Sequence, residues 1–284
     1  SAATIASTVT PSATAMATGR IRAGIGGWTF EPWRGGVFYP DGLRQADELA
    51  YAASKLTAIE INGTYYSSFK PDSWAKWRAA TPEGFKFAVK ASRFCTNRKV
   101  LADGGESMTR FLNQGLSELG DRLGPILWQF ANTKKFDEAD FEGFLKLLPK
   151  AQDGLPLSHV LEVRHQSFVD PAFVALARKY GATVCLADHA TYPMIADVTG
   201  DLVYARLQTG SDDEPTAYAS ADLDQWGGRL KTYAQGGAPA DLQMADAAHP
   251  APTAPRDVYA FVIHEGKVRA PAAALAIIDR VGGA

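Results

Sequence analysis

The stretch 158-SHVLEVRHQSF-168 has the length and apolar content of a buried β-strand, yet it carries two opposite charges. Residues two apart in a strand share a face, so Glu162 and Arg164 point one way while Leu161 and Val163 point the other. A strand that packs apolar side chains on one face and places a carboxylate beside a guanidinium on the other is best explained by a polar pocket on the charged side.

Strand-length apolar runs recur along the chain after residue 20, and segments with helical spacing separate most of them. A helix start is marked by Asp170-Pro171, an N-cap residue followed by proline at the first helical position. Eight β–α alternations predict an α/β chain that forms a single TIM-like (β/α)8 barrel. The segment 189–201 shows no helical pattern, so we expect an irregular sixth crossover. The runs are residues 21–28, 58–62, 85–91, 125–130, 159–165, 182–188, 202–208 and 257–264.

The barrel domain is expected to span residues 21–284. Residues 1–20 are rich in Ala, Thr and Ser and lack the basic start and apolar block of a signal peptide, so we expect a disordered leader there. Residues 235–255 are rich in Ala and Pro and predict a mobile loop insertion before the last strand.

Composition limits the classes of partner. The formal net charge of −2 gives no overall attraction to nucleic acid or to a membrane surface, so neither is an expected partner. No run approaches the ~18 apolar residues of a membrane span. Cys95 and Cys185 form neither a disulfide framework nor a metal motif, and we expect both to be reduced thiols in the cytoplasm. The sequence carries no signal for an oligomeric state.

Alternation along each strand predicts which side chains face the barrel interior. We assume that the more apolar face of each strand packs on the helices. This assumption turns Tyr259, Phe261 and Ile263 outward, opposite His264, and turns Trp28 inward. Most polar residues that it turns inward lie near the carboxyl ends of their strands, where barrel enzymes carry their active sites. They are Glu60, Asn62, Lys90, Gln129, Glu162, Arg164, Tyr204, Arg206 and Gln208.

The chain resembles the DUF72 family, also called the YecE-like proteins, in six stretches that run in family order. They are 24-GIGGWTFEPWRGGVFYP-40, 58-AIEINGTYYSSFKPDSWAKW-77, 81-TPEGFKFAVKASR-93, 123-LGPILWQF-130, 161-LEVRHQSF-168 and 204-YARLQTG-210. The resemblance implies a TIM-like barrel but no reaction, because the function of the family is not established. The family signature falls on Trp28, Trp33, Tyr39, Glu60, Asn62, Thr64, Tyr65, Lys90, Gln129, Glu162, Arg164, His165, Asp188 and Arg206.

Three positions depart from the family pattern. Gln208 stands in 206-RLQTG-210 where the family usually has histidine, and His264 stands in 261-FVIHEG-266 where it usually has an Asn-Asn pair. Asn97 lies in 95-CTNRK-99, which replaces a usual Thr-His. Since ligand contacts are expected in these places, the substrate can differ from that of a typical member.

The pattern favours a metal-independent hydrolase or lyase that acts on an anionic small molecule or phosphoester, with no metal and no cofactor. Lysine and arginine would clamp the anion, and a carboxylate or histidine would transfer protons. The candidate catalytic residues are Glu60, Glu162, His165 and Asp188. The candidate substrate-binding residues are Trp28, Asn62, Tyr65, Lys90, Arg93, Gln129, Arg164, Arg206 and His264.

Three alternatives stay open. One is a metal-dependent sugar isomerase or endonuclease IV-like hydrolase, with oxygen and nitrogen ligands from Glu60, Glu162, Asp188 and His264. Another is a non-catalytic module that stacks a ligand or a nucleic-acid base on Trp28, Trp33, Tyr39, Tyr65 and Tyr66. In the third, the charges only balance one another, with Glu60, Glu162 and Asp188 opposite Lys90, Arg164 and Arg206.

Overall fold

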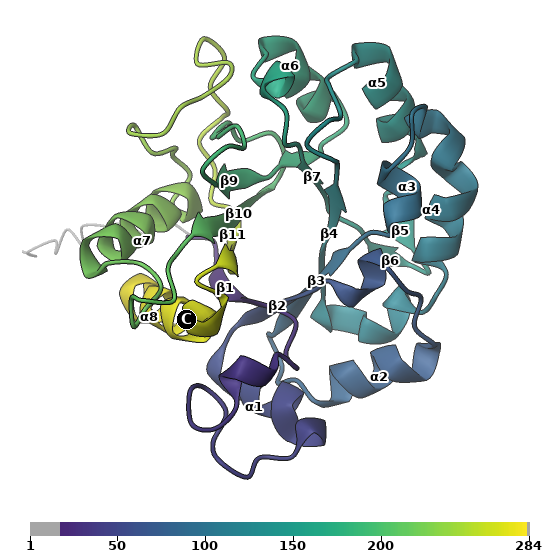
Figure 1. Ribbon diagram of the computed structural model, residues 1–284. Helices are drawn as coiled ribbons and strands as arrows, with labels where there is room; N and C mark the ends of the chain where they lie inside the picture. The colour runs from purple at the N-terminus through teal and green to yellow at the C-terminus, as the bar shows by residue number, and fades with distance from the viewer. Residues whose placement is uncertain (1–17, 283–284) are drawn as a thin grey trace, which may run out of the picture.

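A ring of parallel strands with helices around its outside forms the centre of the structure, a computed structural model that describes residues 18–282 (Figure 1). The strands follow the order β8-β7-β4-β3-β2-β1-β11-β10-β9, and every neighbouring pair is parallel. β8 and β9 are two halves of one strand interrupted at Cys185, so the chain itself joins the two ends of the sheet. The strands are β1 (Ile21–Gly26), β2 (Ala58–Ile61), β3 (Lys86–Lys90), β4 (Leu123–Gln129), β7 (His159–Glu162), β8 (Thr183–Val184), β9 (Leu186–Asp188), β10 (Leu202–Thr209) and β11 (Asp257–Glu265). The predicted TIM-like barrel is confirmed.

The helices follow the strands around the ring (Figure 1). They are α1 (Glu48–Lys55), α2 (Pro71–Ala79), α3 (Arg93–Thr96), α4 (Gly105–Leu112), α5 (Glu138–Leu147), α6 (Pro171–Lys179), α7 (Ser220–Ala234) and α8 (Ala270–Val281). The Asp170 side chain accepts from the Ala172 N–H and caps α6, as predicted. A small antiparallel hairpin, β5 (Ala151–Gln152) and β6 (Leu155–Pro156), precedes β7. Residues 189–201, all of them described, contain no helix, so the irregular sixth crossover is confirmed.

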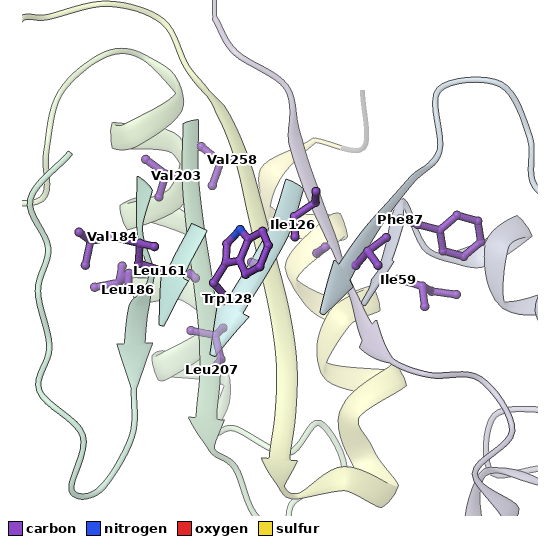
Figure 2. Close-up of a cluster of buried hydrophobic side chains, with 14 of the residues drawn as sticks. Ile59, Phe87, Ile126, Trp128, Leu161, Val184, Leu186, Val203, Leu207 and Val258 are labelled. Carbon is purple, nitrogen blue, oxygen red and sulfur yellow. The ribbon is translucent and has the colours of Figure 1, made fainter. Parts of the chain in front are cut away.

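The main hydrophobic core lies between the strands and the surrounding helices. Ile59, Phe87, Trp128 and Leu161 are fully buried and project outward from their strands, as Figure 2 shows. Burial of each such side chain contributes about 1.5–3 kcal/mol relative to its exposure. This outer layer leaves the opposite faces of the same strands for the barrel interior.

A second apolar cluster fills the barrel interior up to the pocket, and it corrects one prediction. Tyr259, Phe261 and Ile263 point inward and pack with Tyr204, whose ring centroid lies 5.2 Å from that of Phe261. The predicted outward orientation of these three residues is wrong. Both faces of β11 are apolar, so the rule that turns the apolar face outward cannot choose between them, and an eight-stranded barrel needs large side chains to fill its centre.

Trp28 is the second correction, because it does not face the interior. β1 ends at Gly26, and Gly27 adopts a φ of 68°, a conformation that glycine allows and that ends the alternation of the strand. The Trp28 ring lies 5.4 Å from Trp77 of α2 and 6.1 Å from the outward-facing Phe87. Trp28 therefore packs outside the barrel.

Residues 235–255 contain no helix or strand, as expected for a loop. The buried Arg256 holds both ends of the loop, because its guanidinium donates to the carbonyls of Tyr233, Gly237 and Pro252. The mobility of this loop stays a prediction.

The predicted leader lies outside the described residues up to residue 17. Of its last residues, Gly19 donates its N–H to the Ala234 carbonyl, and the Arg20 N–H donates to the Asp257 carboxylate. These two residues therefore contact the barrel. In the part of the chain that the structure describes, no helix has the length and apolar run that crossing a bilayer requires.

Candidate functional site

Arg206 of β10 lies in the middle of a charged network that crosses the barrel interior. Its Nη2 is 2.8 Å from Oε1 of Glu60 on β2, and its Nη1 is 2.5 Å from Oε2 of Glu162 on β7. All three side chains have no solvent exposure, and the Tyr204 hydroxyl donates a further hydrogen bond to Glu60. Side chains from strands that are far apart in the sheet thus meet at one buried guanidinium.

Both carboxyl groups in this network are ionised. Burial alone would raise the pKa of Glu162, but the charges of Arg206, Arg164 and Lys90 outweigh burial and lower the pKa to about 2. The pKa of Glu60 is lowered as well, because Arg206 and Lys90 outweigh the same effect of burial. Two buried carboxylates held in this way are anchors for the arginines.

Arg164 extends the network toward the solvent. Its Nε lies 2.5 Å from Oε1 of Glu162, and its guanidinium stacks 4.6 Å from the centroid of Tyr192. Tyr192 stacks in turn on His189 at 3.5 Å and 4° between the planes. Both residues belong to the irregular sixth crossover, which therefore fixes Arg164. Within residues 18–282 only Nε of this guanidinium donates to protein, so the two terminal nitrogens are left for a ligand.

A pocket of about 360 Å³ opens above this network at the carboxyl ends of the strands. This volume falls within the range of small-molecule sites. The sequence-predicted residues that line it are Asn62, Tyr65, Lys90, Gln129, Arg164, Arg206 and His264. The structure thus brings together residues from six separate strand ends.

Lys90 contributes a buried amine to the pocket wall. It is 7% exposed, and Nζ lies 5.7 Å from the centroid of Tyr65. No carboxylate in residues 18–282 lies within ion-pair distance of Nζ. Burial first, and then the charge of Arg206, lower the pKa of Lys90 to about 8 although Glu60 and Glu162 act in the opposite direction. The fraction of Lys90 that carries a charge therefore changes as the pH passes through about 8.

Two amide oxygens in the pocket lack hydrogen-bond partners within the described part of the chain. Oδ1 of Asn62 and Oε1 of Gln129 are buried without a hydrogen bond, and both residues line the pocket. Buried polar atoms are nearly always paired, so these two acceptors suit hydrogen-bond donors on a ligand or ordered water. Both amide atoms of Gln208 are also buried and unpaired, although Gln208 does not line the pocket.

His264 and Lys267 complete the rim. His264 has a φ of 62°, which is strained for a residue with a Cβ. Loss of part of its water shell, followed by the Arg206, Lys90 and Arg164 charges, lowers the pKa of His264 to about 4, so the imidazole is neutral at pH 7. Lys267 lies in a short 3₁₀ helix, Lys267–Arg269, which Trp33 pins by donating to the Lys267 carbonyl at 2.7 Å.

A family model described as a protein of unknown function, DUF72, matches residues 22–284. The chain belongs to the DUF72 family. No match to it is found among curated proteins.

Solved structures of DUF72 proteins share this fold. A DUF72 family protein from Thermotoga maritima has a TM-score of 0.65 and 21% identity, covering 91% of this chain and 96% of that one. One from Enterococcus faecalis has a TM-score of 0.63 and 16% identity, with 92% and 97% covered. SacUVDE is similar at a TM-score of 0.53 and 9% identity, with 92% and 99% covered. At these identities the likeness concerns the fold alone.

Six of the predicted site residues do not line the pocket of this DUF72 protein: Glu60 and Glu162 lie beneath it, and Trp28, Arg93, His165 and Asp188 lie elsewhere. Trp28 packs outside the barrel, and Arg93 stacks on Phe94 at 5.0 Å. His165 accepts from the Ser167 N–H through Nδ1 and so caps a short 3₁₀ helix. Asp188 accepts hydrogen bonds from the hydroxyls of Thr209 and Tyr218, next to a different surface hollow.

The proposed metal ligands of the DUF72 chain are likewise not assembled. Glu60 and Glu162 are bound by arginines, whereas Asp188 is bound by hydroxyls. No group of three His, Cys, Asp or Glu side chains in the described residues is arranged to hold a metal ion. The alternative in which the charges only balance one another fits Glu60, Glu162, Arg164 and Arg206, which form ion pairs. It does not fit Lys90 and Asp188, which make no ion pair with these four residues.

Some pocket residues of this DUF72 protein were not predicted to bind substrate. The sequence indicates Trp33 and Tyr66 as aromatics that could stack a ligand, and Trp33 also belongs to the family signature, whereas no sequence pattern indicates Lys267. Lys267 follows the last strand by two residues. A scan for cations directly after each predicted strand would have found it.

Proposed function

We propose that this DUF72 protein is a metal-independent hydrolase or lyase that acts on an anionic small molecule. The charge of the pocket carries the proposal. Among residues 18–282, four cationic side chains line the pocket and no carboxylate does, while Glu60 and Glu162 lie beneath it in ion pairs. The cations are Lys90, Arg164, Arg206 and Lys267. A site with this excess of positive charge favours a carboxylate or phosphate group.

The proposed anion lies against Arg164 and Lys267. Arg164 offers two terminal nitrogens whose plane is fixed by Glu162 and Tyr192, which suits bidentate binding of a carboxylate or phosphate. Asn62 and Gln129 then accept hydrogen bonds from hydroxyl or amine groups on the ligand. We therefore infer a substrate that carries both an anionic group and hydrogen-bond donors.

Lys90 is the proposed proton-transfer group. Its pKa of about 8 lies near physiological pH, as efficient acid–base catalysis requires. The sequence pointed to Glu60 or Glu162 for this role, but both carboxylates have lowered pKa values and accept from buried arginines. We assign them the positioning of Arg206 and Arg164 instead.

A non-catalytic ligand-binding module is the second candidate, and the aromatic rim favours it. Tyr66 is 69% exposed, and its ring lies 4.9 Å from that of Tyr65 at an angle of 85°. An exposed aromatic pair beside a pocket can hold a flat ligand. Binding without turnover would favour this candidate.

The expected compartment is the cytoplasm. Cys95 and Cys185 are both buried and unpaired, which supports a reducing environment. Burial raises the pKa of Cys95 to about 12, so this thiol is a poor nucleophile and is not proposed to take part in the reaction.

Calorimetry with inorganic phosphate tests the anion site. We expect the wild type to bind phosphate, and Arg164→Gln and Lys267→Gln each to weaken the affinity about 10-fold, because each removes a charge-assisted contact. Arg44→Gln is the matched control, since Arg44 is 80% exposed and its one ion pair within residues 18–282 is with Asp47. Turnover of a panel of small carboxylates and phosphoesters, followed by mass spectrometry with a chelator present, then tests catalysis. Equal phosphate affinity in all four proteins would contradict the anion site.

A further inference from the structure

Lys90 and Lys267 are the two cations in the pocket wall whose amines have no counter-ion or hydrogen-bond acceptor among the described residues, and of the two only Lys90 is buried. Lys267 differs, because its Nζ lies 4.2 Å from the Phe30 ring on the exposed rim. The Lys90 backbone is fixed, since its carbonyl accepts from the Thr64 hydroxyl at 2.6 Å. A buried and unpaired amine that faces a cavity needs an explanation beyond anion binding, since an exposed ammonium would be enough to bind an anion.

We propose that Lys90 is a nucleophile that forms an imine with the carbonyl carbon of an anionic aldehyde or ketone, so that the enzyme is a lyase acting on carbonyl carboxylates or carbonyl phosphates. This inference rests on the proposed function, because the same pocket must first bind the anionic group. It narrows the substrate class to molecules that carry both an anion and a carbonyl.

The position of the other cations supports this role. Arg164 and Arg206 line the same pocket and are both held by Glu162, so a bound carboxylate or phosphate lies on the side of Glu162. Lys90 lies on β3, two strands from β7 in the sheet. The anion and the carbonyl of one small molecule can therefore contact Arg164 and Lys90 together in a pocket of about 360 Å³.

Tyr65 supplies a proton donor next to Lys90. Its hydroxyl oxygen accepts from Nδ2 of Asn97 at 3.1 Å, and its own O–H has no acceptor within residues 18–282. A hydroxyl that accepts one hydrogen bond still has its proton to give. Asn97 is one of the positions at which the sequence departs from the family pattern, so the contact between Asn97 and Tyr65 is a feature of this chain and not of the usual family pattern.

The covalent step balances without any further reagent. The lone pair of neutral Lys90 Nζ forms a bond to the carbonyl carbon, and the π electrons move to the oxygen, which takes a proton. The nitrogen loses a proton, and the hydroxyl leaves as water with a proton from Tyr65, which gives a protonated imine. The imine then accepts the electron pair of the adjacent carbon–carbon bond as that bond breaks, which leaves an enamine on Lys90. The other fragment departs as a carbonyl compound, and its hydroxyl proton passes to the Tyr65 phenolate. Water protonates the enamine carbon and restores the imine, and the hydroxide so formed adds to the imine and releases the carbonyl product and the neutral amine.

Electrostatics makes the neutral amine available. Burial, and then the Arg206 charge, lower the pKa of Lys90 to about 8, so about a tenth of the amine is neutral at pH 7. An exposed lysine with a pKa near 10.4 has a far smaller neutral fraction at this pH.

Reductive trapping tests the imine on the whole protein. Glyoxylate, the smallest carbonyl carboxylate, is added with sodium cyanoborohydride, and the modified lysines are mapped by peptide mass spectrometry. We expect Lys90 to be labelled at least ~10-fold faster than the exposed Lys55 and Lys146, because of its larger neutral fraction. The labelling should saturate with glyoxylate and decline when inorganic phosphate competes for the pocket.

Two variants separate this inference from the proposed function. Lys90→Arg keeps the charge but cannot form an imine, so it should bind phosphate and lose the rapid adduct, whereas Lys146→Arg, at an exposed lysine outside the pocket, should keep the adduct. If phosphate binds to the wild type but Lys90 is labelled no faster than the exposed lysines, the imine is overturned and the anion site stands. If neither phosphate binding nor selective labelling occurs, both proposals fail.

Discussion

Nη1 of Arg206 lies 2.5 Å from Oε2 of Glu162 although the two residues are 44 positions apart in the sequence and neither side chain has any solvent exposure. Glu60 occupies the other side of the same guanidinium. This contact joins β10 to β7, which flank the strand formed by β8 and β9, and it forms the floor of the pocket. The cations above it are free to bind a ligand because the carboxylates below already have partners.

Loss of Arg206 should strongly destabilise the fold. Arg206→Met would leave Glu60 and Glu162 buried without their main counter-ion, and breaking a buried pair in this way costs about 3–5 kcal/mol. Urea unfolding at pH 7 measures the change in the free energy of unfolding. Arg44→Met, which removes an exposed ion pair, should cost less than about 1 kcal/mol. Equal effects of the two substitutions would show that the buried network does not support the barrel.

Acid should remove the contribution of Glu162. Its pKa is about 2 in the folded protein and 4.5 in the unfolded chain, so the unfolded chain binds the proton first as the pH falls. The stabilisation is complete above pH 4.5 and is lost between pH 4.5 and pH 2. This difference in pKa corresponds to a loss on the order of 3 kcal/mol in the free energy of unfolding. Unfolding by urea at a series of pH values measures this slope. Glu162→Gln should be less stable at pH 7 and show a shallower slope; an unchanged slope would argue against a lowered pKa.

Anion affinity should fall as the pH rises through about 8. Lys90 loses its proton there, and with it one of the positive charges that attract the anion. Sulfate, whose own charge is constant in this range, should bind about 10-fold more weakly at pH 9.5 than at pH 6.5. Lys90→Gln should bind weakly at both pH values and lack this step. A wild type with no change in sulfate affinity over this range would contradict the lowered pKa of Lys90.

The strained backbone at His264 predicts that glycine at this position would stabilise the fold. His264 has a φ of 62°, which glycine adopts without strain, so His264→Gly should raise the free energy of unfolding by about 0.5–1 kcal/mol. Glu265→Gly, at the neighbouring residue that ends β11, is the control and should lower it. Calorimetric melting compares the two. If both substitutions destabilise to the same extent, the strain at His264 is absent.

The barrel could be predicted from sequence because an apolar run marks each strand, and glycine or proline residues mark the turns between the elements. The orientation of side chains was predicted correctly where one strand face is polar, as for Glu60 and Arg206, and wrongly where both faces are apolar, as for Phe261. Alternation also failed where the strand had already ended, as for Trp28 after Gly27.

The site was predictable only as far as strand geometry extends. Lys90, Gln129 and Arg206 lie on strands, and alternation placed them in the pocket. Asp188 ends a strand that is interrupted at Cys185, so its orientation could not be followed from the apolar pattern. Lys267 lies beyond the end of β11, in a short 3₁₀ helix. The alternation of a strand does not extend to such a turn, so the orientation of Lys267 could not be predicted.

A crystal structure of the wild type grown with sulfate or phosphate tests the central claim most directly. The account predicts the anion within hydrogen-bond distance of the terminal nitrogens of Arg164, with Lys90 and Lys267 around it. An anion bound elsewhere on the surface, with only water between Arg164 and Lys90, would contradict it.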